Sequence, residues 1–218
     1  MPDADAVEIR VLGCLIEKQR TTPDQYPLSL NALRLACNQS TNRDPVVEYD
    51  ERTIKAALER MSVRGWTRFA SGAGSRALKY RHLLDEALDL SDADLALLAV
   101  LMLRGPQTLG ELKARTERLH GFDSLEDVQS TLDSLAEREL AARLARRPGQ
   151  KEDRYGQLLG GGGEEEEPPQ PAVAAETPPA DADRLGALER RVERLERQVA
   201  ELAARLRDGG IEEKDANP

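Results

Sequence analysis

Cysteine and histidine are scarce in this sequence, which contains two of each among 218 residues. Cys14 and Cys37 are too few for a disulfide framework, and neither they nor His82 and His120 stand at the spacing of a zinc site. We therefore expect two buried free thiols, no metal ion and no cofactor.

Long apolar stretches are missing too. The longest, from Leu95 to Leu103, has nine residues, whereas a membrane-spanning helix needs about 20. The first ten residues, MPDADAVEIR, show no basic segment followed by an apolar one, so no secretory signal is expected. These absences predict a cytoplasmic protein that does not contact the membrane.

The motifs of common enzyme sites are likewise absent. No serine stands in a G-x-S-x-G pattern, and neither cysteine has a histidine nearby in the sequence. The stretch GAGSRA (72–77) matches a dinucleotide-binding pattern, but the β-like LKYRHL follows it, so a hairpin turn explains it better. We predict no catalytic residues and no enzyme, with a triad scattered along the chain as the remaining alternative.

Charge is distributed unevenly along the chain. Residues 1–90 carry 13 Lys and Arg against 13 Asp and Glu, residues 91–160 carry 10 against 12, and residues 161–218 carry 8 against 15. Most of the net charge of −9 therefore belongs to the C-terminal quarter.

Apolar residues recur at helical spacing in three segments of the first 65 residues. We expect one helix before Pro23, a second that Ser29 caps, and a third between Asp50 and Gly65. The segments WTRFA and ALKYRHL flank the only glycine cluster of this region and predict a β-hairpin. The order helix, short strand, helix, helix, hairpin is that of a winged helix. The residues predicted to share one face are Ile9, Leu12, Leu15 and Ile16 in the first helix and Ile54, Ala57, Leu58 and Met61 in the third, and the second helix is indicated by Leu30, Leu33 and Leu35.

The same order returns after residue 90. Ser91, Thr108 and Ser124 are predicted helix caps, and the second helix is expected to run through Leu119. A shift of 74 residues superposes Ile54 on Val128, and likewise Leu58 on Leu132, Met61 on Leu135 and Trp66 on Leu140. This internal repeat predicts two tandem winged-helix domains.

The segment from Leu95 to Leu103 is apolar on every side, whereas a surface helix of a small domain is apolar along one stripe. We interpret it as a helix buried on two sides, against its own domain and against the other domain or a second subunit. The alternative is an unusually apolar helix within a single core.

Two kinds of sequence follow the second domain. Residues 160–183 mix Gly, Glu, Pro and Ala without apolar periodicity, which predicts a disordered acidic linker. Residues 184–208 show a heptad pattern with Val at a and Leu at d, which favours a parallel two-stranded coiled coil and hence a homodimer. A single helix docked on its own body is the alternative. The predicted dimerisation residues are Leu185, Leu188, Val192, Leu195, Val199, Leu202 and Leu206.

Basic residues gather where a winged helix contacts DNA, namely on the third helix and the hairpin. In the second domain the corresponding helix is neutral to acidic and only the hairpin is basic. The alternative is that these side chains form an ordinary solvated face on a protein-interaction module. The candidate DNA-binding residues are Arg43, Arg52, Lys55, Arg60, Arg68, Arg76, Lys79, Arg81, Arg143, Arg146, Arg147, Lys151 and Arg154.

The segment LGCLIEKQRTTPDQYPLSLNAL, the stretch ACNQSTNRDPV after it and the later LKYRHL together resemble the YceH-like family of bacterial proteins. The resemblance covers about residues 7–158 and implies tandem winged helices and a DNA-binding role. In that family a lysine is usual where this chain has Ser40.

These observations together predict a mainly α fold with small β-hairpins. The expected parts are a winged-helix domain at 1–88, a second at 89–159, the linker at 160–183 and the coiled-coil helix at 184–208. The expected function is binding of duplex DNA by a transcription-regulatory homodimer. The alternative is a non-enzymatic adaptor that binds protein partners.

Overall fold

The computed structural model describes residues 4–70, 78–146 and 152–160. The chain divides into two units, Met1–Glu165 and Glu166–Pro218, and every described residue belongs to the first. The predicted coiled coil at 184–208 and all of the predicted linker except Gly160 lie outside the described residues, as do the glycine turn at 72–77 and the candidates Arg76, Arg147 and Lys151.

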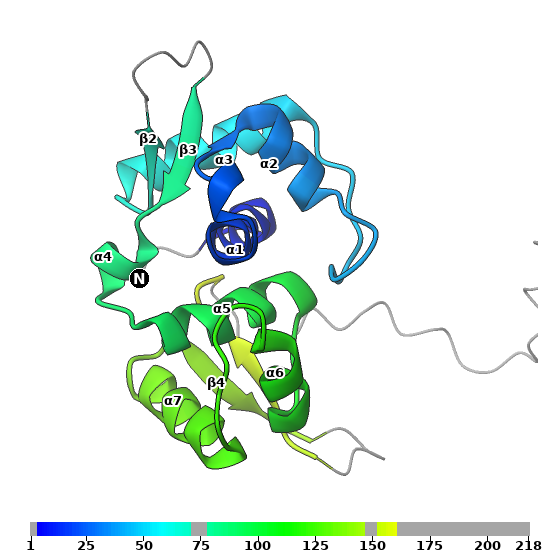
Figure 1. Cartoon of the computed structure of the whole chain (residues 1–218), viewed down its shortest axis with the longest axis vertical. Helices are drawn as coiled ribbons and strands as arrows, with labels where there is room; N and C mark the ends of the chain where they lie inside the picture. The colour runs from blue at the N-terminus through cyan, green and yellow to red at the C-terminus, as the bar shows by residue number, and fades with distance from the viewer. Residues whose placement is uncertain (1–3, 71–77, 147–151, 161–218) are drawn as a thin grey trace, which may run out of the picture. The chain divides into compact units, whose positions relative to one another are not determined.

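The described chain is rich in α-helix and contains small antiparallel sheets (Figure 1). Its first repeat of elements begins with three helices and closes with a hairpin, which the short strand β1 extends to a sheet of order β1-β3-β2. The elements are α1 (Ala6–Thr21), the 3-10 turn η1 (Pro23–Gln25), β1 (Leu28–Ser29), α2 (Leu30–Cys37), α3 (Glu51–Val63), β2 (Thr67–Ala70), β3 (Lys79–His82) and α4 (Leu84–Leu88).

The second repeat has the same order. Its strands form a two-stranded sheet, and a single antiparallel bridge between Gln107 and Tyr155 stands where the first repeat pairs β1 with β3. The elements are α5 (Asp92–Arg104), α6 (Leu109–Thr116), α7 (Leu125–Glu137), β4 (Ala141–Leu144) and β5 (Arg154–Gln157).

The predicted helix caps are present. Ser29 accepts from the Ala32 amide and Asp50 from the Thr53 amide. Ser91, Thr108 and Ser124 each form a capping box with the acidic residue three positions later, an arrangement that satisfies two otherwise unpaired amides. Local sequence therefore fixes where these helices begin.

Leu35, one of the leucines that indicated α2, is 56% exposed, because Leu33, Ala36 and Cys37 take the buried positions. Two other details differ from the sequence prediction. The helix predicted to run through Leu119 ends at Thr116, where α6 gives way to a turn. The short helix α4 was not predicted, since it follows β3 without a side-chain cap.

Main-chain hydrogen bonds repeat at the spacing of the sequence repeat. The amide of Trp66 donates to the Met61 carbonyl at 2.9 Å, and the amide of Leu140 donates to the Leu135 carbonyl at 2.9 Å. Just before each of these bonds the chain takes a left-handed conformation, at Gly65 (φ 77°) and at Glu139 (φ 56°). The two repeats thus leave their third helix through the same turn.

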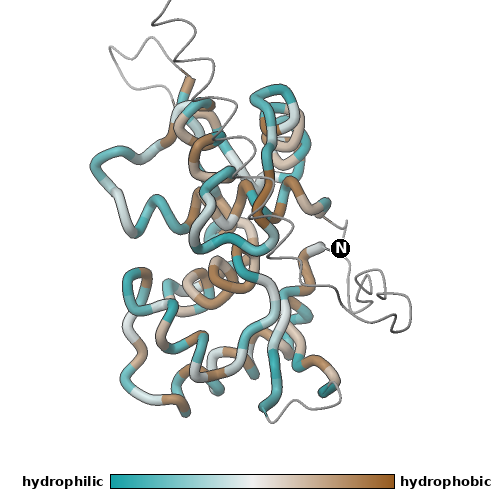
Figure 2. Tube along the Cα trace, turned by 90° about the vertical axis from the view of Figure 1, so that its right-hand side faces the viewer, coloured by the Kyte–Doolittle hydropathy of each residue, from teal (hydrophilic) through white to brown (hydrophobic). Residues whose placement is uncertain are grey.

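Helix α5 lies against α1 of the first repeat and also against α6, α7 and β5 of its own repeat (Figure 1). All residues from Leu95 to Leu103 are buried, so the predicted burial on two sides is confirmed. One cluster of buried apolar residues runs through both repeats, and Figure 2 shows hydrophobic segments running through the inner helices, while the outer loops are largely hydrophilic.

Close packing of α1 and α5 depends on a glycine. A Cβ atom added at Gly13 would lie 2.9 Å from Cγ of Leu103 and 3.1 Å from Cβ of Met102, which is closer than carbon atoms pack. Gly13 therefore lets the two helices approach. Among the described helices none is both long and apolar enough to cross a membrane.

Candidate functional site

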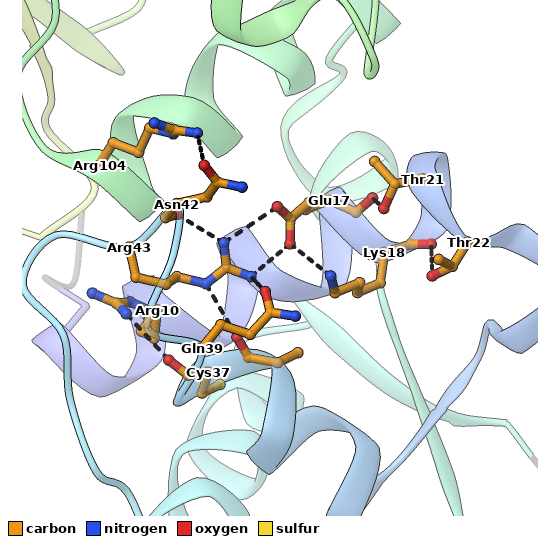
Figure 3. Close-up of polar contacts among 11 residues, drawn as sticks. Arg10, Glu17, Lys18, Thr21, Thr22, Cys37, Gln39, Asn42, Arg43 and Arg104 are labelled. Carbon is orange, nitrogen blue, oxygen red and sulfur yellow. Dashed lines mark hydrogen bonds and ion pairs between the residues drawn. The ribbon is translucent and has the colours of Figure 1, made fainter.

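The loop between α2 and α3 contains Arg43, which was predicted as a phosphate or partner contact. Its side chain is completely buried and forms an ion pair with Glu17 of α1, at 2.6 Å from Nη2 to Oε2 (Figure 3). The guanidinium also donates to the Ala36 and Asn42 carbonyls and to the Gln39 side chain, so all five of its N–H groups have acceptors. A side chain buried in this way is not available to DNA, and Arg43 is removed from the proposed surface.

Charge and burial act in opposite directions on this pair. Burial by itself would raise the pKa of Glu17, but the hydrogen bonds and charge of Arg43 outweigh it and lower that pKa. Burial would lower the pKa of Arg43, yet the contact with Glu17 raises it. Both groups are therefore held in their charged forms, and the pair joins the loop to the middle of α1.

Arg10 and the two cysteines surround the same loop. Arg10 donates to the carbonyls of Cys37 and Pro45, at 3.2 and 2.6 Å. Cys14 and Cys37 are buried and free, as the sequence predicted. The loop segment from Asn42 to Pro45 is thus held from the inside of the protein by the side chains of Arg10 and Arg43.

Helix α3 presents a mixed face to solvent. Arg52 and Lys55 in its first half are exposed, and Lys55 lies 3.9 Å from Glu59, a loose contact of little energetic weight. Arg60 is 47% exposed but pairs with Asp5 and Glu8 of α1, at 2.5 and 3.0 Å. Arg60 therefore connects two helices, while Arg52 and Lys55 remain on the open face.

The hairpin of β2 and β3 has a basic outer face. Its register places Arg68 directly opposite Arg81, and Ala70 opposite Lys79. Thr67 and His82, one position away, are buried against the core, so Arg68, Lys79 and Arg81 share the other face, because side chains alternate along a strand.

Little in the described chain neutralises this outer face. Arg81 reaches Glu86 at 3.2 Å, whereas Arg68 forms no ion pair with any residue that the structure describes. Like charges placed directly opposite each other across a strand pair are destabilising. The opposition of Arg68 and Arg81 is therefore unfavourable for folding in the absence of a nearby anion.

The second repeat is charged differently. The exposed side of α7 contains Gln129, Ser130, Asp133, Ser134 and Glu137, which with Glu126 border a shallow hollow. Arg143 and Arg146 of the second hairpin both pair with Asp153, and the hydrogen bond from Arg146 is the main reason that the pKa of Asp153 lies below its usual value. Arg154 donates to the Pro106 carbonyl at 3.0 Å. Arg143 and Arg146 thus share a carboxylate within the protein, whereas the close partner of Arg154 is a neutral carbonyl.

Two arginines outside the predicted set, Arg104 at the end of α5 and Arg115 on α6, line a cavity together with Arg154. Arg104 and Arg115 lie outside the third helices and hairpins, where a winged helix contacts DNA, and no spacing pattern connects them with Arg154. Only the folded chain brings them together. No cluster of His, Cys, Asp and Glu side chains suited to a metal ion occurs in the described part of the chain.

The structure defines an α-rich protein whose two similar halves pack together through the central helices α1 and α5. Proteins similar to this chain are known. The family model described as "Protein of unknown function, DUF480" matches residues 4–150. A UPF0502 protein of Solibacter usitatus is 49% identical over 193 residues, which is 88% of this chain and 93% of the relative. The UPF0502 protein YceH of Escherichia fergusonii is 46% identical over 208 residues, covering 92% and 93%.

This protein belongs to the UPF0502 family, which includes YceH. The resemblance inferred from the sequence motifs is therefore confirmed.

Proposed function

We propose that this protein is a DNA-binding regulator built from two tandem winged helices, in which the first repeat makes the principal contact with duplex DNA. The observation that carries the proposal is the outer face of the first hairpin, where Arg68 stands directly opposite Arg81. Glu86 pairs with Arg81, whereas Arg68 forms no ion pair with a described residue. Phosphates are the natural counter-ions for such a face.

The order of elements supports this assignment. In the first repeat α2 and α3 correspond to a helix-turn-helix, and the hairpin that β1 extends corresponds to the wing. Arg52 and Lys55 are exposed on the first half of α3, the part of a recognition helix that approaches base edges. The proposed division of work is that α3 reads the groove and the wing holds the backbone.

The second repeat is proposed to support the first without placing its helix in the groove. Glu126, Asp133 and Glu137 on the exposed side of α7 would face phosphates with like charge. This observation favours a second function for the same chain, a non-enzymatic adaptor in which α7 binds a basic protein segment. DNA binding by the first repeat and protein binding by the second are compatible.

DNA binding is tested by measuring affinity for mixed-sequence duplex at several salt concentrations. The wild type should bind with a steep negative slope of log affinity against log salt. The double variant R68Q/R81Q should bind more weakly. The magnitude of its slope should be smaller by roughly two, because each phosphate contact contributes about 0.9.

The matched control is R143Q/R146Q, which removes two arginines from the second hairpin that share the Asp153 carboxylate. R143Q/R146Q should change the slope less than R68Q/R81Q does. Absence of binding by the wild type at low salt would remove the DNA proposal, and a basic peptide would then be the next probe for α7.

We further propose that residues 184–208 pair two copies of the chain, on the evidence of the heptad pattern. A dimer would present two DNA-binding units to neighbouring half-sites. Deleting residues 184–210 should halve the mass measured by multi-angle light scattering. A full-length chain that is already monomeric would exclude the pairing.

A further inference from the structure

A cavity of about 400 Å3 lies where the two repeats meet. Its wall includes the loop between α2 and α3, the turn after α5, one side of α6 and the second hairpin. This volume is within the range of small-molecule sites in proteins. None of the residues in this wall belongs to the proposed DNA contacts of α3 or of the first hairpin.

Positive charge is in excess in this wall. Arg104, Arg115 and Arg154 line the cavity together with the carboxylates Glu111 and Asp44. Arg43 also borders it, but Glu17 already neutralises that guanidinium.

Of the two carboxylates, Glu111 is the one shared among several donors. It lies 3.4 Å from Arg115 and 4.0 Å from Arg154, and it accepts from the Thr108 amide at 2.9 Å as part of the cap of α6. Arg104 forms no ion pair within the described residues and donates instead to the neutral side chain of Asn42 (Figure 3). Glu111, which already serves a helix cap, and Asp44, which forms no ion pair with a described residue, leave an excess of one positive charge beside the three guanidinium groups.

The effect of this crowding is visible at Arg104. Burial lowers the pKa of Arg104, and repulsion from Arg115 and Arg43 lowers it further, against the weaker attraction of Glu17 and Glu111. The site therefore favours an additional negative charge.

The wall is held rigidly by Gln107. Its side-chain nitrogen donates to the carbonyls of Arg104, Gly105 and Pro106, at 3.0, 3.3 and 3.0 Å. Its main chain exchanges two hydrogen bonds with Tyr155, at 3.0 and 2.8 Å. These bonds hold the turn after α5, which positions Arg104. They also hold the Pro106 carbonyl, which accepts a hydrogen bond from Arg154. This part of the wall is therefore in place before a ligand binds.

Gln107 also leaves one acceptor unfilled. Its Oε1 atom is buried and receives no hydrogen bond from the described residues. Buried polar atoms in native proteins nearly always have a partner. An amide oxygen needs a hydrogen-bond donor, so this atom points to an ordered water or a hydroxyl group rather than to an anionic oxygen.

We propose that this cavity binds a small oxyanion ligand, a molecule with a phosphate or carboxylate group, with Arg104, Arg115 and Arg154 as its binding residues. Guanidinium groups match both oxyanions through paired N–H donors. The occupant contacts Arg104 and Arg115 from two helices of the second repeat and lies beside the α2–α3 loop of the first. The proposal does not depend on whether the chain binds DNA.

The test is calorimetric titration of the full chain with inorganic phosphate, glycerol 3-phosphate and malonate at constant ionic strength set with chloride. At least one of these anions should bind saturably to a single site per chain. The R104Q and R115Q variants should each weaken that binding about tenfold or more. R118Q, which changes an exposed arginine just beyond α6 that does not line the cavity, should bind as the wild type does.

The pattern of binding identifies the ligand class. Binding of phosphate and glycerol 3-phosphate alone indicates a phosphate ester, and binding of malonate alone indicates a carboxylate. A measurement on the wild type guards against variants that fold poorly: the amide resonances of Gly105 and Gln107 should shift on titration, while that of Gly65 should not. Non-saturable binding of all three anions, or equal binding by R104Q, R115Q and R118Q, would overturn the proposal.

Discussion

Single side chains decide how much charge this protein presents to solvent. Three arginines illustrate this. Arg43 is buried in an ion pair with Glu17, and Arg60 connects α3 to α1 through ion pairs. Arg68, in contrast, is exposed on the first hairpin. The difference comes from what each guanidinium meets in the folded chain. Removing either member of the buried Arg43–Glu17 pair would leave an uncompensated charge, at a cost of about 3–5 kcal/mol.

His82 makes the stability of the first repeat depend on pH. Burial, with the nearby Arg20 and Arg81, lowers its pKa from 6.5 to about 4 in spite of the opposing charge of Asp85. The folded protein holds the ring neutral, with Nε2 at 2.5 Å from Oε1 of Gln19, while the unfolded chain binds a proton below about pH 6.5.

Stability should therefore fall as the pH drops from 6.5 towards 4, by on the order of 2 kcal/mol between pH 7 and pH 5. Urea unfolding at the two values measures this change. H82Q, which removes the titrating group, should show a markedly smaller difference between pH 7 and pH 5. A difference as large as that of the wild type would assign the dependence to other groups.

At the scale of elements, the predictions that succeeded rest on local rules. Helix starts followed from capping residues, and the hairpins followed from β-prone segments on either side of a turn. The burial of Arg43 could not be predicted, because its partner Glu17 is 26 residues away in the sequence. The residues next to an arginine in the sequence do not show whether its side chain is buried or exposed. The cavity was missed for the same reason, since Arg104 meets Asn42 across 62 residues.

The turn after the third helix allows a direct comparison of the two repeats. Glu139 has a left-handed backbone (φ 56°) where the first repeat has Gly65 (φ 77°). A residue with a Cβ atom is strained there, so E139G should stabilise the protein by about 0.5–1 kcal/mol. Urea midpoints give the measurement.

The converse change, G65A, should destabilise the protein by about 1 kcal/mol. An added Cβ at Gly65 meets no atom within 4 Å, so any loss comes from the backbone alone. If G65A and E139G both left the midpoint unchanged, strain at this turn would not be a source of instability.

On the scale of the whole molecule, the contact of α1 with α5 makes one folded body of two repeats. G13A should test it, because the new methyl group would press on Leu103 and Met102. Overpacking costs about 1–3 kcal/mol, and the gain in helix propensity returns up to about 1 kcal/mol. We expect a net loss of stability of up to about 2 kcal/mol by chemical denaturation.

G110A is the matched control for this change. Gly110 is also helical, and no atom lies within 4 Å of a Cβ added there. It should stabilise the protein by up to about 1 kcal/mol through propensity alone, since Gly110 is the second residue of α6. Equal effects of G13A and G110A would mean that the helices separate easily at their crossing.

The loop between α2 and α3 is hydrogen-bonded to the second repeat. The amide of Asp44 donates to the Leu103 carbonyl at the end of α5, at 2.8 Å, and Arg104 holds Asn42. The loop that leads into α3 therefore also borders the proposed anion site. Thermodynamic linkage makes the consequence symmetrical: an anion that tightens DNA binding tenfold must itself bind tenfold more tightly to the DNA complex. Measuring either affinity with the other ligand present would therefore report on both.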